Sequence, residues 1–160
     1  MVDVLWARPD GERVLLAPTA AVADFIASVY RFDRIEVAAV DGGCDGRTLD
    51  VDAGPLSIHL AASRGWPLPP AFLRPAWCTR FVEGPIARMA MGVRTCGVTP
   101  TGVREWYRAD RWSPVVTGSA AVDGIDLGPM GAVDPPCRFG FSEPPRRPSI
   151  TAVRPLLEFP

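Results

Sequence analysis

The stretch VRTCGVTPTGVREWY, residues 93–107, gives the strongest local indication of the fold. Thr99-Pro100-Thr101-Gly102 suits a type I turn, which favours proline at its second position and glycine at its fourth. The stretch therefore predicts a β-hairpin. Because side chains alternate along a strand, Glu105 and Tyr107 should share one face of the second strand, and Trp106 should lie on the other. The sequence leaves open which face is internal.

Asp-Gly pairs separate most of the other segments that are typical of strands. Such pairs favour the positive φ angles of tight hairpins, and they begin at Asp10, Asp41, Asp45 and Asp123. We therefore expect sequential antiparallel pairing and more strand than helix. The predicted strands are Val2 to Ala7, Arg13 to Ala17, Arg34 to Val40, Arg47 to Asp52, Pro55 to Ala62, Pro114 to Val122, Cys137 to Phe141 and Ile150 to Phe159.

Two segments have helical patterns. The main helix is predicted at about 19–31, where Thr19 suits an N-cap and apolar residues recur at helical spacing. A second segment, at about 70–91, contains Pro75 and Gly84-Pro85, which predict two short helices with a break. The fold class we predict is α+β, in a single domain over residues 1–160.

The basic residues exclude several kinds of chemistry. All seventeen are Arg, and the chain has no Lys. A Schiff base, a pyridoxal anchor and a P-loop lysine are therefore excluded. Arg cannot act as a nucleophile, but its planar fork suits carboxylate and phosphate oxygens. Any bound anion should therefore depend on Arg or on backbone N–H groups.

The charge distribution and the cysteine positions argue against several classes of binding partner. A formal net charge of −1 with interspersed charges argues against nucleic acid, and no apolar stretch has transmembrane length, so we expect no membrane partner and a cytoplasmic location. The four cysteines are scattered, without a CxxC pair or a histidine at ligand spacing. We expect no metal site and no cofactor.

The candidate site residues come from the hairpin and from one strand before it. Arg94 would bind an anion, Tyr107 would orient a ligand, and Trp106 would line the cavity. Glu105 and His59 would handle protons. Each has a structural alternative: a lone histidine is commonly a satisfied, partly buried side chain, and Trp or Tyr can simply fill the core.

The order of elements resembles the uncharacterised relatives of acetoacetate decarboxylase over roughly residues 47–155. The resemblance rests on the strand-rich half, the Pro-broken segment 70–91, the Arg-Thr-x-Gly…Gly-x-Arg-Glu-Trp-Tyr hairpin, the Pro-Pro strand 135–141 and a closing strand. It implies an antiparallel sheet curling into a barrel or cone around a small-molecule cavity. The decarboxylase depends on a catalytic Lys, which this chain does not have. Schiff-base decarboxylation is therefore not implied.

Two classes of function stay open. In the first, a small-molecule-binding barrel acts as an isomerase, cyclase or lyase on a small carboxylate or β-dicarbonyl compound. In the second, a non-catalytic ligand-binding or protein-interaction domain uses the same polar groups to satisfy one another. The oligomeric state is open, a homo-oligomer included.

Overall fold

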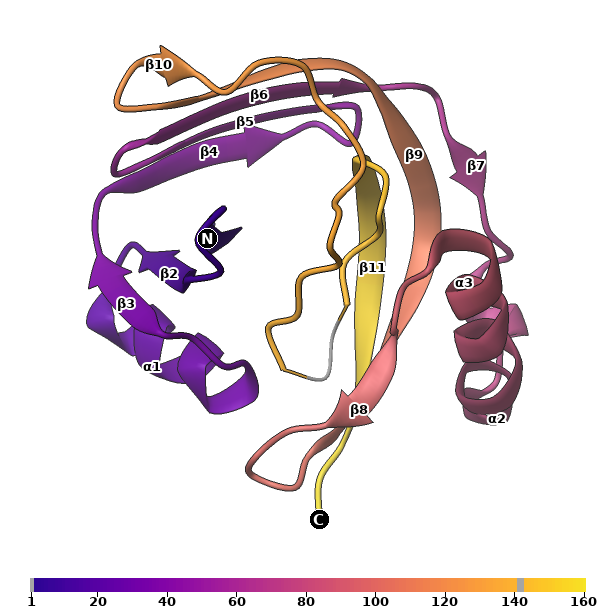
Figure 1. Ribbon diagram of the computed structural model, residues 1–160. Coiled ribbons are helices and arrows are strands. Elements are labelled where there is room, and N and C mark those ends of the chain that lie inside the picture. The colour runs from indigo at the N-terminus through magenta and orange to yellow at the C-terminus, as the bar shows by residue number, and fades with distance from the viewer. Residues whose placement is uncertain (1, 141–142) are drawn as a thin grey trace.

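The computed structural model describes residues 2–140 and 143–160, which form two sheets. The smaller sheet contains β1 (Val4–Ala7), β2 (Arg13–Ala17) and β3 (Arg34–Val37). The larger contains β4 (Val40–Cys44), β5 (Thr48–Ala53), β6 (Leu56–Ala62), β7 (Trp66–Pro67), β8 (Cys96–Val98), β9 (Arg104–Val122), β10 (Ile125–Asp126) and β11 (Ser149–Glu158). Figure 1 shows the larger sheet arching over the smaller one.

Strand β2 is the centre of the hydrophobic core because both of its faces are covered. Val14 and Leu16 pack against β5 and β6 of the larger sheet, in a cluster with Val51 and Leu56. Leu15, on the opposite face of β2, packs against helix α1 (Ala20–Val29). The molecule is therefore layered as helix, small sheet and large sheet, as Figure 1 shows.

Helix α1 confirms the main helix predicted at 19–31, with slightly shorter bounds. The Thr19 side chain accepts a hydrogen bond from the backbone N–H of Val22, as expected of the N-cap. Strands β2 and β3 pair in parallel, and α1 makes the crossover between them. The expectation of antiparallel pairing throughout is wrong here, because a parallel pair needs such a crossover and α1 supplies it.

Strand β9 organises the larger sheet. Its first half pairs with β7, β8 and β11, and its second half pairs with β6 and β10. The register shifts opposite Ala152/Val153 of β11 and opposite Ala61/Ala62 of β6. Bulges of this kind bend a strand and increase its twist, and Figure 1 shows β9 curving from the top of the molecule down one side.

The larger sheet is open. The main pairing path ends at β10 and β4, and no described residues pair these two strands with each other. The sheet-dominated α+β class is confirmed, whereas closure into a barrel is not observed. Within the described residues, no helix is both long and apolar enough to cross a membrane.

The second helical segment is continuous over residues 76–91, so the predicted break at Gly84-Pro85 is wrong. After a 3₁₀ turn (Ala71–Leu73), α2 (Ala76–Cys78) begins behind its N-cap Pro75 and leads through a π-helical turn, η2 (Thr79–Glu83), into α3 (Gly84–Met91). Pro85 has no N–H to donate, and its ring would clash with the carbonyl four residues earlier in a regular helix. The wider π turn before it accommodates the proline.

Most predicted turns are confirmed. In the 93–107 hairpin, the N–H of Gly102 donates to the carbonyl of Thr99 at 3.0 Å, and Gly102 has φ +85°. Asp41-Gly42 is an exception: it lies within β4, where Gly42 pairs with Val51. The strand predicted at 137–141 is not formed by residues 137–140, and Phe141 lies outside the described residues.

Candidate functional site

The hairpin places Glu105 and Tyr107 on the side of β9 that faces the end of α1. Helix α1 ends at Val29, and the extended C-cap Tyr30 directs its hydroxyl onto that of Tyr107, with which it forms a hydrogen bond. Tyr107 in turn hydrogen-bonds the carboxylate of Glu105. The Tyr107 hydroxyl has one proton, so when it donates to the ionised carboxylate its oxygen accepts from Tyr30. The three side chains form one hydrogen-bonded chain.

Burial shifts the titration of every group in this chain. Glu105 is 8% exposed, and burial raises the pKa of its carboxyl, although the hydrogen bond from Tyr107 opposes the shift. Burial also raises the pKa of Tyr30 and that of Tyr107. The phenols therefore stay protonated, and Glu105 holds its proton to higher pH than an exposed glutamate does. When Glu105 is protonated, the hydrogen bonds can run in the other direction: Glu105 donates to Tyr107, and Tyr107 donates to Tyr30. The hydroxyl proton of Tyr30 then points away from Tyr107.

Tyr30 also lines a cavity of about 370 Å³, within the range of small-molecule sites. The cavity lies between β1 and the segment that precedes β11. Its other lining residues are mainly apolar: Leu5, Ala7, Val133, Cys137, Phe139 and Pro144. Burial raises the pKa of the Cys137 thiol, so this cysteine stays protonated and is a poor nucleophile. Tyr30 is the residue that joins the cavity to the hydrogen-bonded chain.

Asp3 supplies a second carboxyl group near Tyr30. Leu5 and Ala7 of β1 line the cavity, and Asp3 precedes β1 in the same alternation. The charge of Asp3 raises the pKa of Tyr30, and burial raises the pKa of Asp3 itself. Two carboxyls, Asp3 and Glu105, therefore act on one phenol that lines the cavity.

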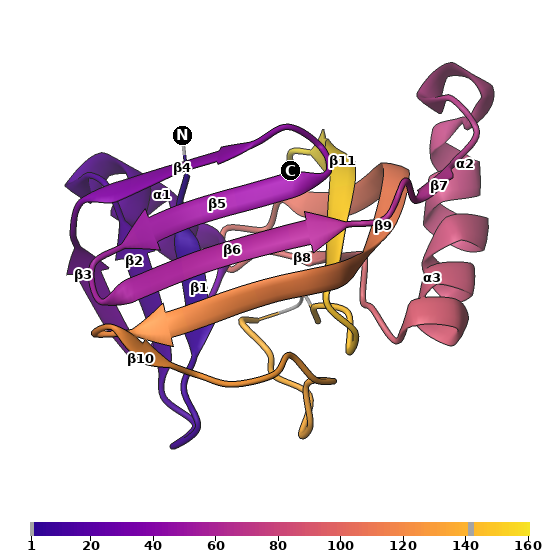
Figure 2. The same ribbon diagram turned by 90° about the horizontal axis from the view of Figure 1, so that it is seen from above.

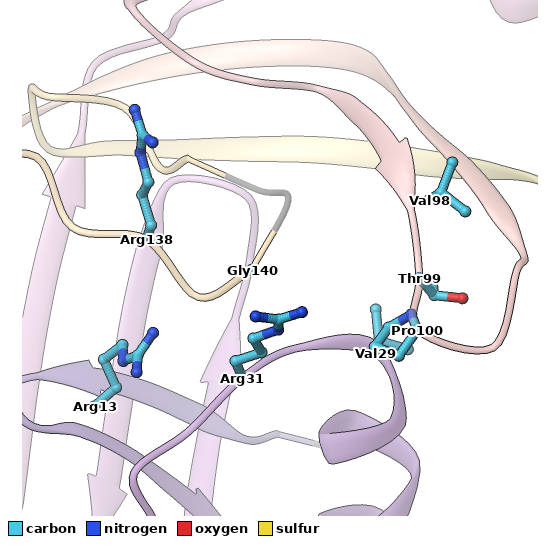
Figure 3. A pocket seen from close by; sticks show the side chains of 8 residues that line it. All are labelled: Arg13, Val29, Arg31, Val98, Thr99, Pro100, Arg138 and Gly140. Atoms are coloured by element: carbon cyan, nitrogen blue, oxygen red, sulfur yellow. The ribbon is translucent and has the colours of Figure 1, made fainter.

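A second cavity, of about 490 Å³, lies on the other side of the wall formed by residues 30–31 and 138–140. The N–H of Arg31 donates to the carbonyl of Phe139 at 3.0 Å, which holds the two segments of the wall together. Figure 3 shows that the side chains of Arg13, Arg31 and Arg138 lie around this cavity.

The three arginines differ in their partners. Arg13 is held by Asp33, with 2.7 Å between guanidinium and carboxylate, and Arg138 lies 2.9 Å from the carboxylate of Glu143. Arg31 forms no ion pair with any described residue. Its guanidinium is the one that a small anion in this cavity would meet without displacing an acidic partner.

The structure brings together two of the five predicted site residues, Glu105 and Tyr107. His59 lies on the outer face of β6, because Leu56 and Ile58 occupy the inner face, and it pairs there with Asp50. The grouping of His59 with Glu105 is therefore wrong.

Arg94 and Trp106 are also outside the cluster. Arg94 is exposed and pairs through its backbone with Glu143. Trp106 lies on the opposite face of β9 from Glu105, under the guanidinium of Arg80 at 4.6 Å from the ring centroid. Alternation along the hairpin predicts that Trp106 and Glu105 lie on opposite faces of β9. This is inconsistent with the prediction that both residues serve one cavity.

Sequence reasoning missed Tyr30 and Asp3 for different reasons. Tyr30 ends the apolar stripe of α1, where it reads as a core residue although its hydroxyl needs a partner. Asp3 precedes a strand in which every second side chain lines the cavity, and that alternation is the one signal in the sequence that could have indicated it.

No group of three His, Cys, Asp or Glu side chains within the described ranges is arranged to hold a metal ion. Comparison with protein-family models, curated proteins and solved structures found no match to this chain. The resemblance to acetoacetate decarboxylase relatives therefore stays a prediction.

Proposed function

We propose that this protein binds a small ketone or β-dicarbonyl compound in the cavity beside Tyr30 and moves a proton between its carbon and oxygen atoms. The activity is that of an isomerase, cyclase or lyase that begins with enolisation. The observation that carries the proposal is the chain Tyr30–Tyr107–Glu105, which ends in a carboxyl of raised pKa and begins at the cavity wall. The arching sheet would serve as the cone-like enclosure that the resemblance implies.

The Asp3 carboxylate takes the proton from the carbon next to the carbonyl, and the C–H electron pair moves into the new C=C bond. The carbonyl oxygen takes the proton of Tyr30, Tyr30 takes that of Tyr107, and Tyr107 takes that of Glu105. The products are the enol, protonated Asp3 and ionised Glu105. A phenol and a neutral carboxylic acid in an apolar site stabilise a developing enolate by donating hydrogen bonds to its oxygen.

The test uses acetylacetone as the probe. Exchange of its central C–H protons for deuterium is followed by NMR with the parent protein and with Tyr30→Phe, Glu105→Gln and Asp3→Asn. We expect catalysed exchange by the parent and a loss of roughly 10²- to 10⁴-fold in the variants, the usual contribution of general acid–base catalysis. His59→Ala is the control, because His59 lies on the outer face, and it should exchange at the parent rate. Parent-level exchange in Tyr30→Phe and Asp3→Asn would show that the chemistry is elsewhere.

A second candidate is supported by the arginine cavity. Arg31, which forms no ion pair with a residue that the structure describes, favours non-catalytic binding of a small carboxylate. Calorimetric titration with malonate tests it: binding that is lost in Arg31→Ala, together with no acetylacetone exchange in the parent, would favour this second function over the first.

A further inference from the structure

The helical segment 71–91 presents its apolar side chains to solvent. Six large apolar residues along it are between 54% and 85% exposed: Phe72, Leu73, Trp77, Phe81, Ile86 and Met89. Trp77 and Phe81 are four residues apart, and Met89 follows eight residues later, so they lie on one side of the helix. Figure 2 shows this helix at one side of the molecule, next to β9 and β7.

Charged groups of the same segment hold it on the sheet. Arg74, which is 6% exposed, pairs with Glu83 at 3.2 Å and with Asp110 of β9 at 3.1 Å. Arg80 lies over Trp106 and pairs with Glu158 of β11 at 2.7 Å. A helix on the surface of a globular protein normally has the reverse arrangement, with its apolar stripe toward the core. The reversal indicates that the outer stripe is covered by something else.

The exposed apolar area along segment 71–91 matches one side of a stable protein interface. If each of the six side chains has about 200 Å² of surface, their exposed fractions leave roughly 800 Å² of apolar area. This exceeds the largest apolar patch of a typical monomer, roughly 300–600 Å². It equals the roughly 800 Å² that each partner contributes to an interface of standard size.

The charges along the segment favour a second copy of this chain over a membrane or a charged partner. Residues 76–91 contain three charged side chains, and two of them, Arg80 and Glu83, are paired inward. Only Arg88 of that helical run makes no ion pair with a described residue. Helices that bind a membrane surface have a strongly basic face, which this one does not have. An apolar stripe without charges is complementary to itself when two copies meet around a two-fold axis.

We propose that the chain forms a homodimer in which the segments 71–91 of two copies pack antiparallel, with Trp77 and Phe81 at the centre of the interface. This inference does not depend on the proposed function. Aromatic side chains in the centre of an interface carry most of its binding energy.

Sedimentation velocity over a wide concentration range tests the proposal. The parent should be a dimer, and Phe81→Glu should raise the dimer Kd by at least about thirtyfold, which corresponds to about 2 kcal/mol. Phe25→Glu is the matched control, because Phe25 is also an exposed helical phenylalanine, 68% against 73% for Phe81. This variant should stay dimeric. Circular dichroism should show the parent spectrum for both variants.

Three results would overturn the proposal. A parent that is monomeric at its highest soluble concentration has no such interface. Dimers that persist in both Phe81→Glu and the second variant Trp77→Glu associate through another surface. A monomeric parent that sediments with phosphatidylserine vesicles, and a Phe81→Glu variant that does not, would show that a membrane covers the stripe.

Discussion

Replacing Tyr107 by Phe should destabilise the protein in a pH-dependent way. The substitution keeps the ring but removes the hydroxyl that donates to Glu105, which is buried. A hydrogen bond to a charged group contributes about 1.5–3 kcal/mol to stability, and one between neutral groups about 0.5–1.5 kcal/mol. The lost bond to Glu105 should therefore lower the free energy of unfolding by about 1.5–3 kcal/mol where Glu105 is ionised and about 1 kcal/mol where it is protonated. The lost bond to Tyr30 adds about 0.5–1.5 kcal/mol at both pH values.

The sign of the pH effect follows from the raised pKa of Glu105. The folded state binds this proton more tightly than the unfolded state does, so its contribution to stability is present below the ordinary glutamate pKa and is lost as the pH rises through the folded value. Removing the Tyr107 donor raises the pKa of Glu105 further, so the free energy of unfolding falls by a larger amount at high pH. Glu105→Gln does not titrate, so Tyr107→Phe in that background should cost the same at both ends of the range.

Urea unfolding on the acidic and the alkaline side of the Glu105 titration measures these differences. For a domain of this size each 1 kcal/mol corresponds to about 2–4 °C in Tm, so a thermal melt provides a second readout. The reasoning is refuted if Tyr107→Phe costs the same at both pH values in the parent background, because Glu105 would then not depend on Tyr107 for its charge.

Three further predictions concern the scaffold. A Cβ on Gly42 would lie 2.7 Å from the backbone oxygen of Asp50, whereas a Cβ on Gly43 would meet nothing within 4 Å. In urea unfolding, Gly42→Ala should therefore lower the free energy of unfolding by about 1–3 kcal/mol, and Gly43→Ala should be neutral or slightly stabilising. Equal effects of the two substitutions would contradict the β4 register. Asp110→Ala removes a partner of the buried Arg74 and should lower the free energy of unfolding by about 2–4 kcal/mol. Glu158→Ala breaks an exposed pair and should lower it by about 0–1 kcal/mol. A similar loss in both variants would contradict the burial of the Arg74 pair. Hydrogen bonds from Arg13 lower the pKa of Asp33 to about 2. The stability that this pair gives should therefore be complete above the ordinary pKa of 3.8 and disappear as the pH falls toward 2. An NMR titration in which Asp33 has an ordinary pKa would refute this.

Local chemistry in the sequence determined much of the secondary structure. The 99–102 turn, the Thr19 cap and the Asp45-Gly46 and Asp123-Gly124 turns are confirmed because each depends on a few neighbouring residues. Alternation also separated Glu105 and Tyr107 from Trp106 without any tertiary information.

Tertiary structure decided what the local pattern leaves undetermined. Gly42 lies in a strand rather than a turn because β5 pairs with it, and the helix continues through Pro85 because a π turn absorbs the proline. The candidate site joins Tyr30 at the end of α1 to Tyr107 on β9, which are far apart in the chain, and His59 is excluded from it because the inner face of β6 packs on the core. Side-chain periodicity assigns residues to faces, but only the packing of sheets and helix determines which faces meet.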